Sequence, residues 1–162
     1  YTLGVLHHTP DTFEALVSCA KKLKPGAPFI IYLYYSMDNK PFWYRSLWKL
    51  SDFFRKVISK LPFPIKFLIS QLIGLIIYLP LARFSLMMDK LGFEIKNFPL
   101  SDYRLKPFYV LRTDALDRFG TRLEQRFSKI EIIDMLERAG FSNITFSEKP
   151  PFWTALAYRN ND

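Results

Sequence analysis

The sequence predicts an α/β fold, on the strength of three observations. The chain opens with a short apolar run, residues 1–8, that ends in two histidines ahead of a helix start signal. Residues 27–35 (APFIIYLYY) are almost all apolar, as in a parallel strand that is covered on both faces. Residues 128–158 read as a helix followed by strands at 143–147 and 152–158, which form a hairpin at the sheet edge. Strand, helix and buried strand within about 35 residues make a βαβ unit, whose crossover is right-handed.

The helices beside the sheet carry clear end signals. Asp11 followed by Glu14 has the spacing of a capping box, and so has Ser128 followed by Glu131. Gly140 is the residue type that ends a helix in the left-handed conformation, which favours a stop at that position. We therefore expect one helix after each capping box, both packed on the sheet.

Composition sets the class of protein. The 162 residues are 49% apolar and 17% aromatic, which excludes a disordered chain. Cys19 is the single cysteine, so an intrachain disulfide is excluded, and we expect this side chain to be a small helical residue. The sequence has no signal-peptide pattern, which favours a cytoplasmic protein. Because the chain begins at Tyr1, we expect it to be a fragment whose N-terminal part is missing.

The positive charge is concentrated in the middle of the chain. The net charge of the whole sequence is +8, and residues 40–96 hold ten Lys and Arg side chains against three carboxylates, a charge of +7. Phospholipid surfaces, RNA and phosphorylated substrates are the anionic partners that such a segment suits. A solvated helix face is the alternative explanation.

Residues 41–112 read as a helical insertion. Six apolar side chains step by three and four residues along one helical stripe, opposite a basic face: Trp43, Leu47, Leu50, Phe54, Val57 and Leu61. Residues 67–79 are apolar almost all round, but they fall short of the ~20 residues that span a bilayer, which predicts a buried or interfacial helix. Residues 108–111 read as a short strand, and residues 114–126 as a loop or a broken helix.

Four motifs together resemble a known family. They are V-L-H-H at residues 5–8, L-K-P-G at residues 23–26 with alanine in place of a second glycine, the apolar strand at residues 29–35, and A-G-F at residues 139–141. In this order and spacing they resemble the second half of class I S-adenosylmethionine-dependent methyltransferases, closest to the type 11 small-molecule branch. The resemblance covers the two ends of the chain and not its middle.

The resemblance implies the C-terminal half of a Rossmann-like sheet. This chain would supply strands four to seven, with the last strand antiparallel between the fifth and the sixth, and a large helical insertion. Residues 1–40 would be core, residues 41–112 the lid, and residues 113–162 the core helix and closing hairpin. The family's glycine-rich loop and the acidic residue ending its second strand are absent here. We therefore expect the full protein, and not this piece alone, to bind S-adenosylmethionine.

The family pattern also implies site residues. Val5, Leu6, His7 and His8 match positions that lie against the methyl end of the cofactor. Three roles stay open for His7 and His8, namely general base, wall of the cofactor pocket, and structural packing. No metal site is expected, because two adjacent histidines lack a carboxylate cluster.

The substrate side is expected where the lid meets the core. Tyr34, Tyr35, Trp43 and Tyr44 lie at that hinge in the sequence, where aromatic side chains enclose an apolar or planar acceptor or anchor the lid helix. Arg122 is a candidate for binding an anionic substrate group.

The function that these patterns favour is methyl transfer to a small lipophilic or amphipathic acceptor. The first alternative is a non-enzymatic module that binds a membrane surface or a protein partner through residues 41–91, which would make the protein membrane-associated. The second is an RNA methyltransferase, but the charge lies opposite an apolar stripe and not among exposed aromatics, so nucleic acid is the least favoured partner.

Overall fold

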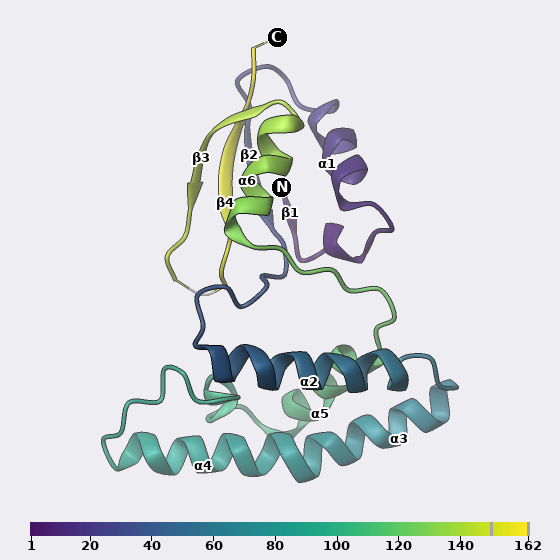
Figure 1. Ribbon diagram of the computed structural model, residues 1–162, viewed down its shortest axis with the longest axis vertical. Coiled ribbons are helices and arrows are strands. Elements are labelled where there is room, and N and C mark those ends of the chain that lie inside the picture. Colours follow the sequence, from purple (N-terminus) through teal and green to yellow (C-terminus); the bar gives the residue numbers. More distant parts are fainter. Residues whose placement is uncertain (150, 162) are drawn as a thin grey trace. The chain divides into compact units, whose positions relative to one another are not determined.

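The chain divides into two compact units in the computed structural model of Figure 1, which describes residues 1–149 and 151–161. The first unit combines Tyr1–Asp38 with Leu123–Asp162, and the second is Asn39–Arg122. The predicted α/β class is confirmed, because the first unit combines a mixed sheet with helices packed on it. The second unit is helical.

The sheet of the first unit is mixed. Its strands are β1 (Thr2–Leu3), β2 (Pro28–Tyr32), β3 (Phe141–Phe146) and β4 (Ala155–Arg159), in the order β1-β2-β4-β3. β1 runs parallel to β2, whereas β4 lies antiparallel to both of its neighbours. In the register of the sheet Ile31 pairs with Thr2 on one side and with Ala155 on the other.

Both predicted N-caps start helices of this unit, and the reciprocal bond of a capping box forms at the second of them. At α1 (Thr12–Ala20), Asp11 Oδ1 accepts the Glu14 N–H at 2.9 Å. At α6 (Lys129–Arg138), Ser128 and Glu131 make the reciprocal pair of a full capping box. Gly140 follows α6 at φ 82°, where any side chain would strike the guanidinium of Arg159. The cap signals of the sequence are therefore confirmed.

The hydrophobic core lies on one side of the sheet. It joins side chains of α1 and α6 to alternate residues of the strands, among them Leu16, Leu136, Phe29, Ile31 and Ala157. Ile30, between Phe29 and Ile31, is 44% exposed. The expectation of a second strand covered on both faces is wrong for the first unit, because α1 and α6 pack on the same face.

The opening apolar run is not one continuous strand. Gly4 adopts φ 72° and turns the chain out of β1, and the 3-10 helix η1 (Leu6–His8) follows. Leu6 and His7 are buried in this short helix. The two histidines are therefore held in a helical turn at the carboxyl end of β1.

The second unit is built from α2 (Phe42–Ile58), α3 (Phe63–Ile73), the π-helix η2 (Gly74–Tyr78), α4 (Leu79–Lys90), the short 3-10 helix η3 (Ser101–Tyr103) and α5 (Phe108–Gly120). The predicted strand at residues 108–111 is wrong, because α5 covers it. For residues 114–126 the prediction was a loop or a broken helix, and the structure has continuous helix to Gly120 followed by a loop. α5 also places residues 113–122 in the second unit, whereas the sequence put the end of the lid at residue 112.

α3, η2 and α4 form one helix, Phe63–Lys90, that is long and apolar enough to cross a membrane, by length and composition only. Pro80 does not end it, because the proline falls at the start of α4, directly after the π-turn. The sequence predicted a buried or interfacial helix that is too short to span a bilayer. The predicted length is wrong, because the helix has 28 residues, and the buried alternative is wrong, because only 17% of its apolar window is buried.

Candidate functional site

The predicted site residues of the first unit gather at the carboxyl ends of β1 and β2. His7 and His8 lie on η1 after β1, and Tyr34 and Tyr35 follow β2. The His7 ring lies 4.2 Å from that of His8 and 3.8 Å from that of Tyr34, centroid to centroid. This end of adjacent parallel strands is where open α/β sheets place their ligands.

A segment from the far end of the chain completes this edge. Gln125 donates its N–H to the His7 carbonyl at 3.0 Å, and Phe127 donates to the Tyr34 carbonyl at 2.9 Å. The Ser36 N–H returns a bond to the Phe127 carbonyl at 2.9 Å. Residues 123–128 thus run beside both strand ends. Sequence reasoning missed them, because a short polar stretch without periodicity carries no strand signal.

His7 is fully buried and faces Tyr34. Its ring stacks on that of Tyr34 with an interplanar angle of 26°, and its Nδ1 accepts the Tyr34 N–H at 3.3 Å. Since Nδ1 is the acceptor in this bond, the proton of the neutral ring is assigned to Nε2. Nε2 has no hydrogen-bond partner among the described residues. A buried donor of this kind is costly to leave unpaired.

The environment of His7 keeps its ring neutral. Burial is the main cause that lowers the His7 pKa from its ordinary 6.5 to about 4, and the charges of His8 and Arg126 lower it further, against Glu124, which raises it. At neutral pH His7 is therefore a hydrogen-bond donor and not a proton acceptor.

His8 has the opposite arrangement. Its Nδ1 lies 2.7 Å from the Leu123 carbonyl oxygen, which only accepts, so Nδ1 carries the proton. The lone pair is thus on Nε2 of a ring that is partly exposed. A histidine whose Nδ1–H is held by a backbone carbonyl is oriented to take a proton at Nε2. Of the two histidines, His8 is the one that fits a general base.

An ion pair forms another wall of this site. Arg126 Nε lies 2.8 Å from Glu124 Oε1, and both side chains are largely buried. The Arg126 guanidinium covers the Tyr34 ring at 5.0 Å and donates to the Tyr35 carbonyl at 3.3 Å. Glu124 was not among the site residues predicted from the sequence, and Arg122 was the arginine predicted to bind an anionic group.

The other predicted substrate residues lie in the second unit. Trp43 is 51% exposed at the start of α2, with its ring 5.6 Å from that of Tyr44. Arg122 donates through Nε to the Ser59 carbonyl at 3.2 Å. That they share a substrate site with Tyr34 and Tyr35 stays a prediction, as does the contact of the exposed Val5 with a cofactor.

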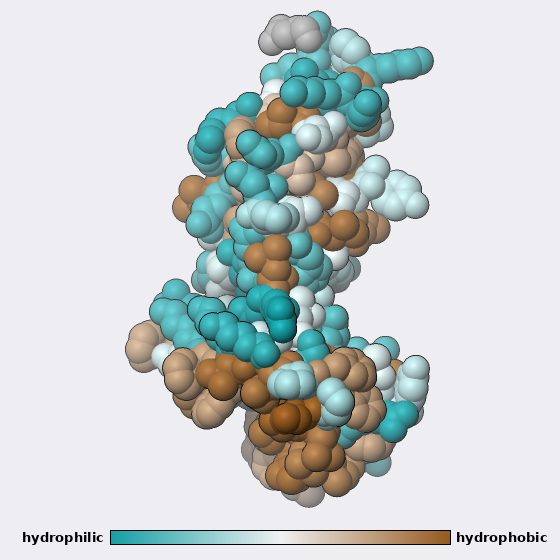
Figure 2. All heavy atoms as spheres, turned by 90° about the vertical axis from the view of Figure 1, so that its right-hand side faces the viewer, coloured by the Kyte–Doolittle hydropathy of each residue, from teal (hydrophilic) through white to brown (hydrophobic). Residues whose placement is uncertain are grey.

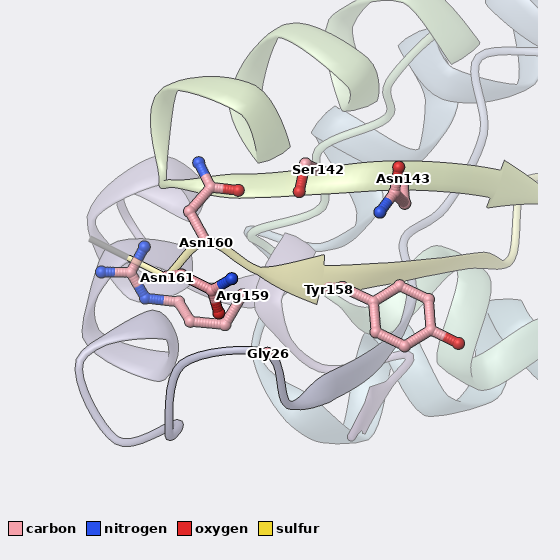
Figure 3. A pocket seen from close by; sticks show the side chains of 7 residues that line it. All are labelled: Gly26, Ser142, Asn143, Tyr158, Arg159, Asn160 and Asn161. Carbon is pink, nitrogen blue, oxygen red and sulfur yellow. The ribbon is translucent and has the colours of Figure 1, made fainter.

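Two surface hollows are lined by other residues than the histidines. One, of ≈ 430 Å³, is at the opposite end of the sheet, where Ser142 and Asn143 lie on β3 and Tyr158 on β4 (Figure 3); it is lined by Gly26, Ser142, Asn143, Tyr158, Arg159, Asn160 and Asn161. The other, of ≈ 410 Å³, lies in the second unit and is lined by Lys56, Ser59, Lys60 and Arg122. Its three cationic side chains suit an anion.

Comparison of the chain with protein-family models, with curated proteins and with solved structures finds no match.

Proposed function

We propose that the protein is an S-adenosylmethionine-dependent methyltransferase of small, lipophilic or amphipathic acceptors. The observation that carries the proposal is the strand order β1-β2-β4-β3 with β4 antiparallel to both neighbours. The resemblance implies this order for the fourth, fifth, seventh and sixth strands of a class I methyltransferase. The histidine turn then falls at the carboxyl end of the fourth strand, as that resemblance implies.

The residues of the first unit fit the needs of a methyl transfer. S-adenosylmethionine, when bound, supplies a methyl group that is already activated on a sulfonium. The protein has to align the acceptor and to remove its proton where the acceptor is a hydroxyl. His8 Nε2 takes that proton, while the Leu123 carbonyl holds the other ring nitrogen. His7 is buried and stacked on Tyr34, and so anchors the turn that carries His8.

The test is cofactor binding followed by turnover. Calorimetry on the full-length natural protein is expected to detect S-adenosylmethionine, and incubation with a panel of lipophilic hydroxyl compounds is expected to release S-adenosylhomocysteine. Absence of cofactor binding by the folded full-length protein would refute the proposal.

A variant separates the two histidines. His8→Asn keeps a donor for the Leu123 carbonyl but has no group that takes a proton. We expect unchanged cofactor affinity and a turnover about 10²- to 10⁴-fold lower on hydroxyl acceptors. Equal turnover by wild type and His8→Asn would remove His8 from the proton transfer and leave methyl transfer itself unaffected.

A further inference from the structure

The helix Phe63–Lys90 has its small residues inside the second unit. Ser70, Ala82 and Ser85 are fully buried, and Gly74 is buried beside α5. A Cβ atom on Gly74 would lie 3.0 Å from the Cα atom of Arg112, so α5 approaches closer than a side chain allows. Small residues on this side allow the backbones of the two helices to approach closely.

The large apolar side chains of the same helix point away from the unit. Five of them are between 46% and 66% exposed: Leu68, Leu72, Leu75, Ile76 and Met87. Figure 2 shows apolar side chains of the second unit gathered in brown at the surface. Water-soluble helices bury this kind of side chain, so this face requires an apolar partner.

The π-turn η2 keeps the small residues on one side. Ser70 and Ala82 are twelve residues apart, which in a regular α-helix would leave them about 120° apart around the axis. A π-turn takes up one extra residue and reduces that angle to about 20°. The helix is thus wound so that its small side and its large apolar side both continue from α3 into α4.

In α2, too, polar side chains face the inside of the unit and large apolar side chains face outward. Arg55 is 4% exposed and donates to Asp52 Oδ1 at 2.7 Å and to the Thr121 carbonyl at 3.0 Å, inside the unit. Five members of the predicted apolar stripe are between 46% and 55% exposed: Trp43, Leu47, Leu50, Phe54 and Val57. The polar contacts are again inside and the apolar side chains outside.

The cations are placed at the ends of the long helix. No charged residue occurs between Lys66 and Arg83, and Lys90 ends α4. The cationic hollow of Lys56, Ser59, Lys60 and Arg122 lies where α2 ends, just before α3 begins. An apolar face with cations at its rim matches an anionic phospholipid layer, whose headgroups are negative and whose acyl chains are apolar.

We propose that the outward face of helix Phe63–Lys90 docks on the surface of an anionic phospholipid bilayer, with a lipid headgroup in the hollow of Lys56, Lys60 and Arg122. The helix lies along the membrane and does not cross it. α5 packs against its middle at Gly74, and α5 carries Arg112, Asp114 and Asp117. A crossing helix would take these charges into the hydrocarbon, whereas a helix that lies flat leaves them on the water side.

Vesicle flotation of the full chain tests the proposal. We expect the protein to float with vesicles of phosphatidylcholine containing about 30 mol% phosphatidylserine, and binding to weaken with added salt. Ile76→Glu is expected to lower the apparent affinity at least about tenfold, because it places a carboxylate in the apolar face. Lys60→Glu is expected to lower it about tenfold for vesicles with phosphatidylserine, by reversing a rim charge.

The matched controls are Ile130→Glu, at a 79% exposed position on α6, and Lys24→Glu, on the first unit. Both should bind as wild type, and circular dichroism should show all variants folded. The proposal is overturned if the folded protein does not float with vesicles that contain phosphatidylserine. It is overturned equally if Ile76→Glu floats like wild type, or if Ile76→Glu dissociates a dimer that wild type forms without lipid, since the face then binds a second copy.

Discussion

His7 and His8 are neighbours in the chain with opposite roles at the sheet edge. The Tyr34 N–H donates a hydrogen bond to Nδ1 of His7, whereas Nδ1–H of His8 donates one to the Leu123 carbonyl. The sequence showed that two histidines end a strand, but it left their roles open. The partners come from residues 27 and 115 positions away, so no local pattern could have assigned the tautomers.

The lowered His7 pKa predicts a loss of stability in acid. An unfolded His7 is protonated below its ordinary pKa of about 6.5, whereas the folded one resists protonation down to about 4. Between pH 6.5 and pH 4 protons therefore favour the unfolded state. The contribution of neutral His7 to the unfolding free energy is complete above pH 6.5 and is lost as the pH falls towards 4. We expect urea denaturation to show at most about 3 kcal/mol of this loss.

His7→Asn is the control for this pH dependence. Asparagine offers an oxygen to the Tyr34 N–H and has no proton to gain, so the unfolding free energy of this variant should change less between pH 7 and pH 4.5. Parallel curves for wild type and variant would assign the acid sensitivity to other groups.

Arg55 and Lys56 pair with the same carboxylate, one as a buried and the other as an exposed cation. Both contact Asp52, but the Arg55 side chain is 4% exposed and that of Lys56 is 66% exposed. Burial alone would raise the pKa of the Asp52 carboxyl, yet hydrogen bonds from Arg55 and Lys56 outweigh it and lower that pKa.

Removing the buried partner should destabilise the protein far more. We expect Arg55→Ala to lower the unfolding free energy by about 3–5 kcal/mol, and Lys56→Ala by under about 1 kcal/mol, in chemical denaturation at neutral pH. Equal losses would mean that the two cations are equally solvated.

At the scale of elements, local signals were sufficient at the helix ends and failed in helix interiors. The N-caps Asp11 and Ser128 are where the sequence places them, because a cap needs only side chains three residues apart. Pro80 does not break the long helix, because it falls in the first turn of α4 directly after the π-turn. α5 was missed because its polar sequence has little periodicity and its formation depends on packing against α3.

A substitution at Gly74 tests the close contact between the long helix and α5. The Cβ of a valine there would meet the α5 backbone at Arg112, which has to move away. We expect Gly74→Val to lower the unfolding free energy by about 1–3 kcal/mol. Gly120→Ala is the control, since its Cβ would meet only the Leu116 side chain at 3.4 Å, and it should be neutral or stabilising.

At the scale of the whole molecule, the second unit is inserted into the first. The chain leaves the first unit after Asp38 and returns at Leu123. The two crossing points are tied together within the first unit, since Lys129 donates its N–H to Asp38 Oδ2 at 3.1 Å and Ser36 donates to the Phe127 carbonyl at 2.9 Å. The sequence predicted an insertion over residues 41–112, whereas the second unit is Asn39–Arg122, and most of the difference is the second part of α5.

Removing the insertion should leave the first unit folded. About six Gly and Ser residues, which span up to about 20 Å, would join Asp38 to Leu123. We expect dispersed amide resonances in a ¹⁵N–¹H spectrum and one cooperative thermal transition. A spectrum typical of a molten globule would show that the core of α1, α6 and the sheet depends on the insertion.

The central place of β4 in the sheet sets the order in which a ribosome completes this protein. β4 hydrogen-bonds to both β2 and β3, yet it follows every other described strand in the chain. Until residues 155–159 have emerged, β2 and β3 have no common neighbour and residues 1–38 have an incomplete core. The helices of residues 39–122 contact one another within a continuous segment, and they can fold while β4 is still in the exit tunnel. The nascent chain would therefore present its apolar helical face to lipid before its sheet exists.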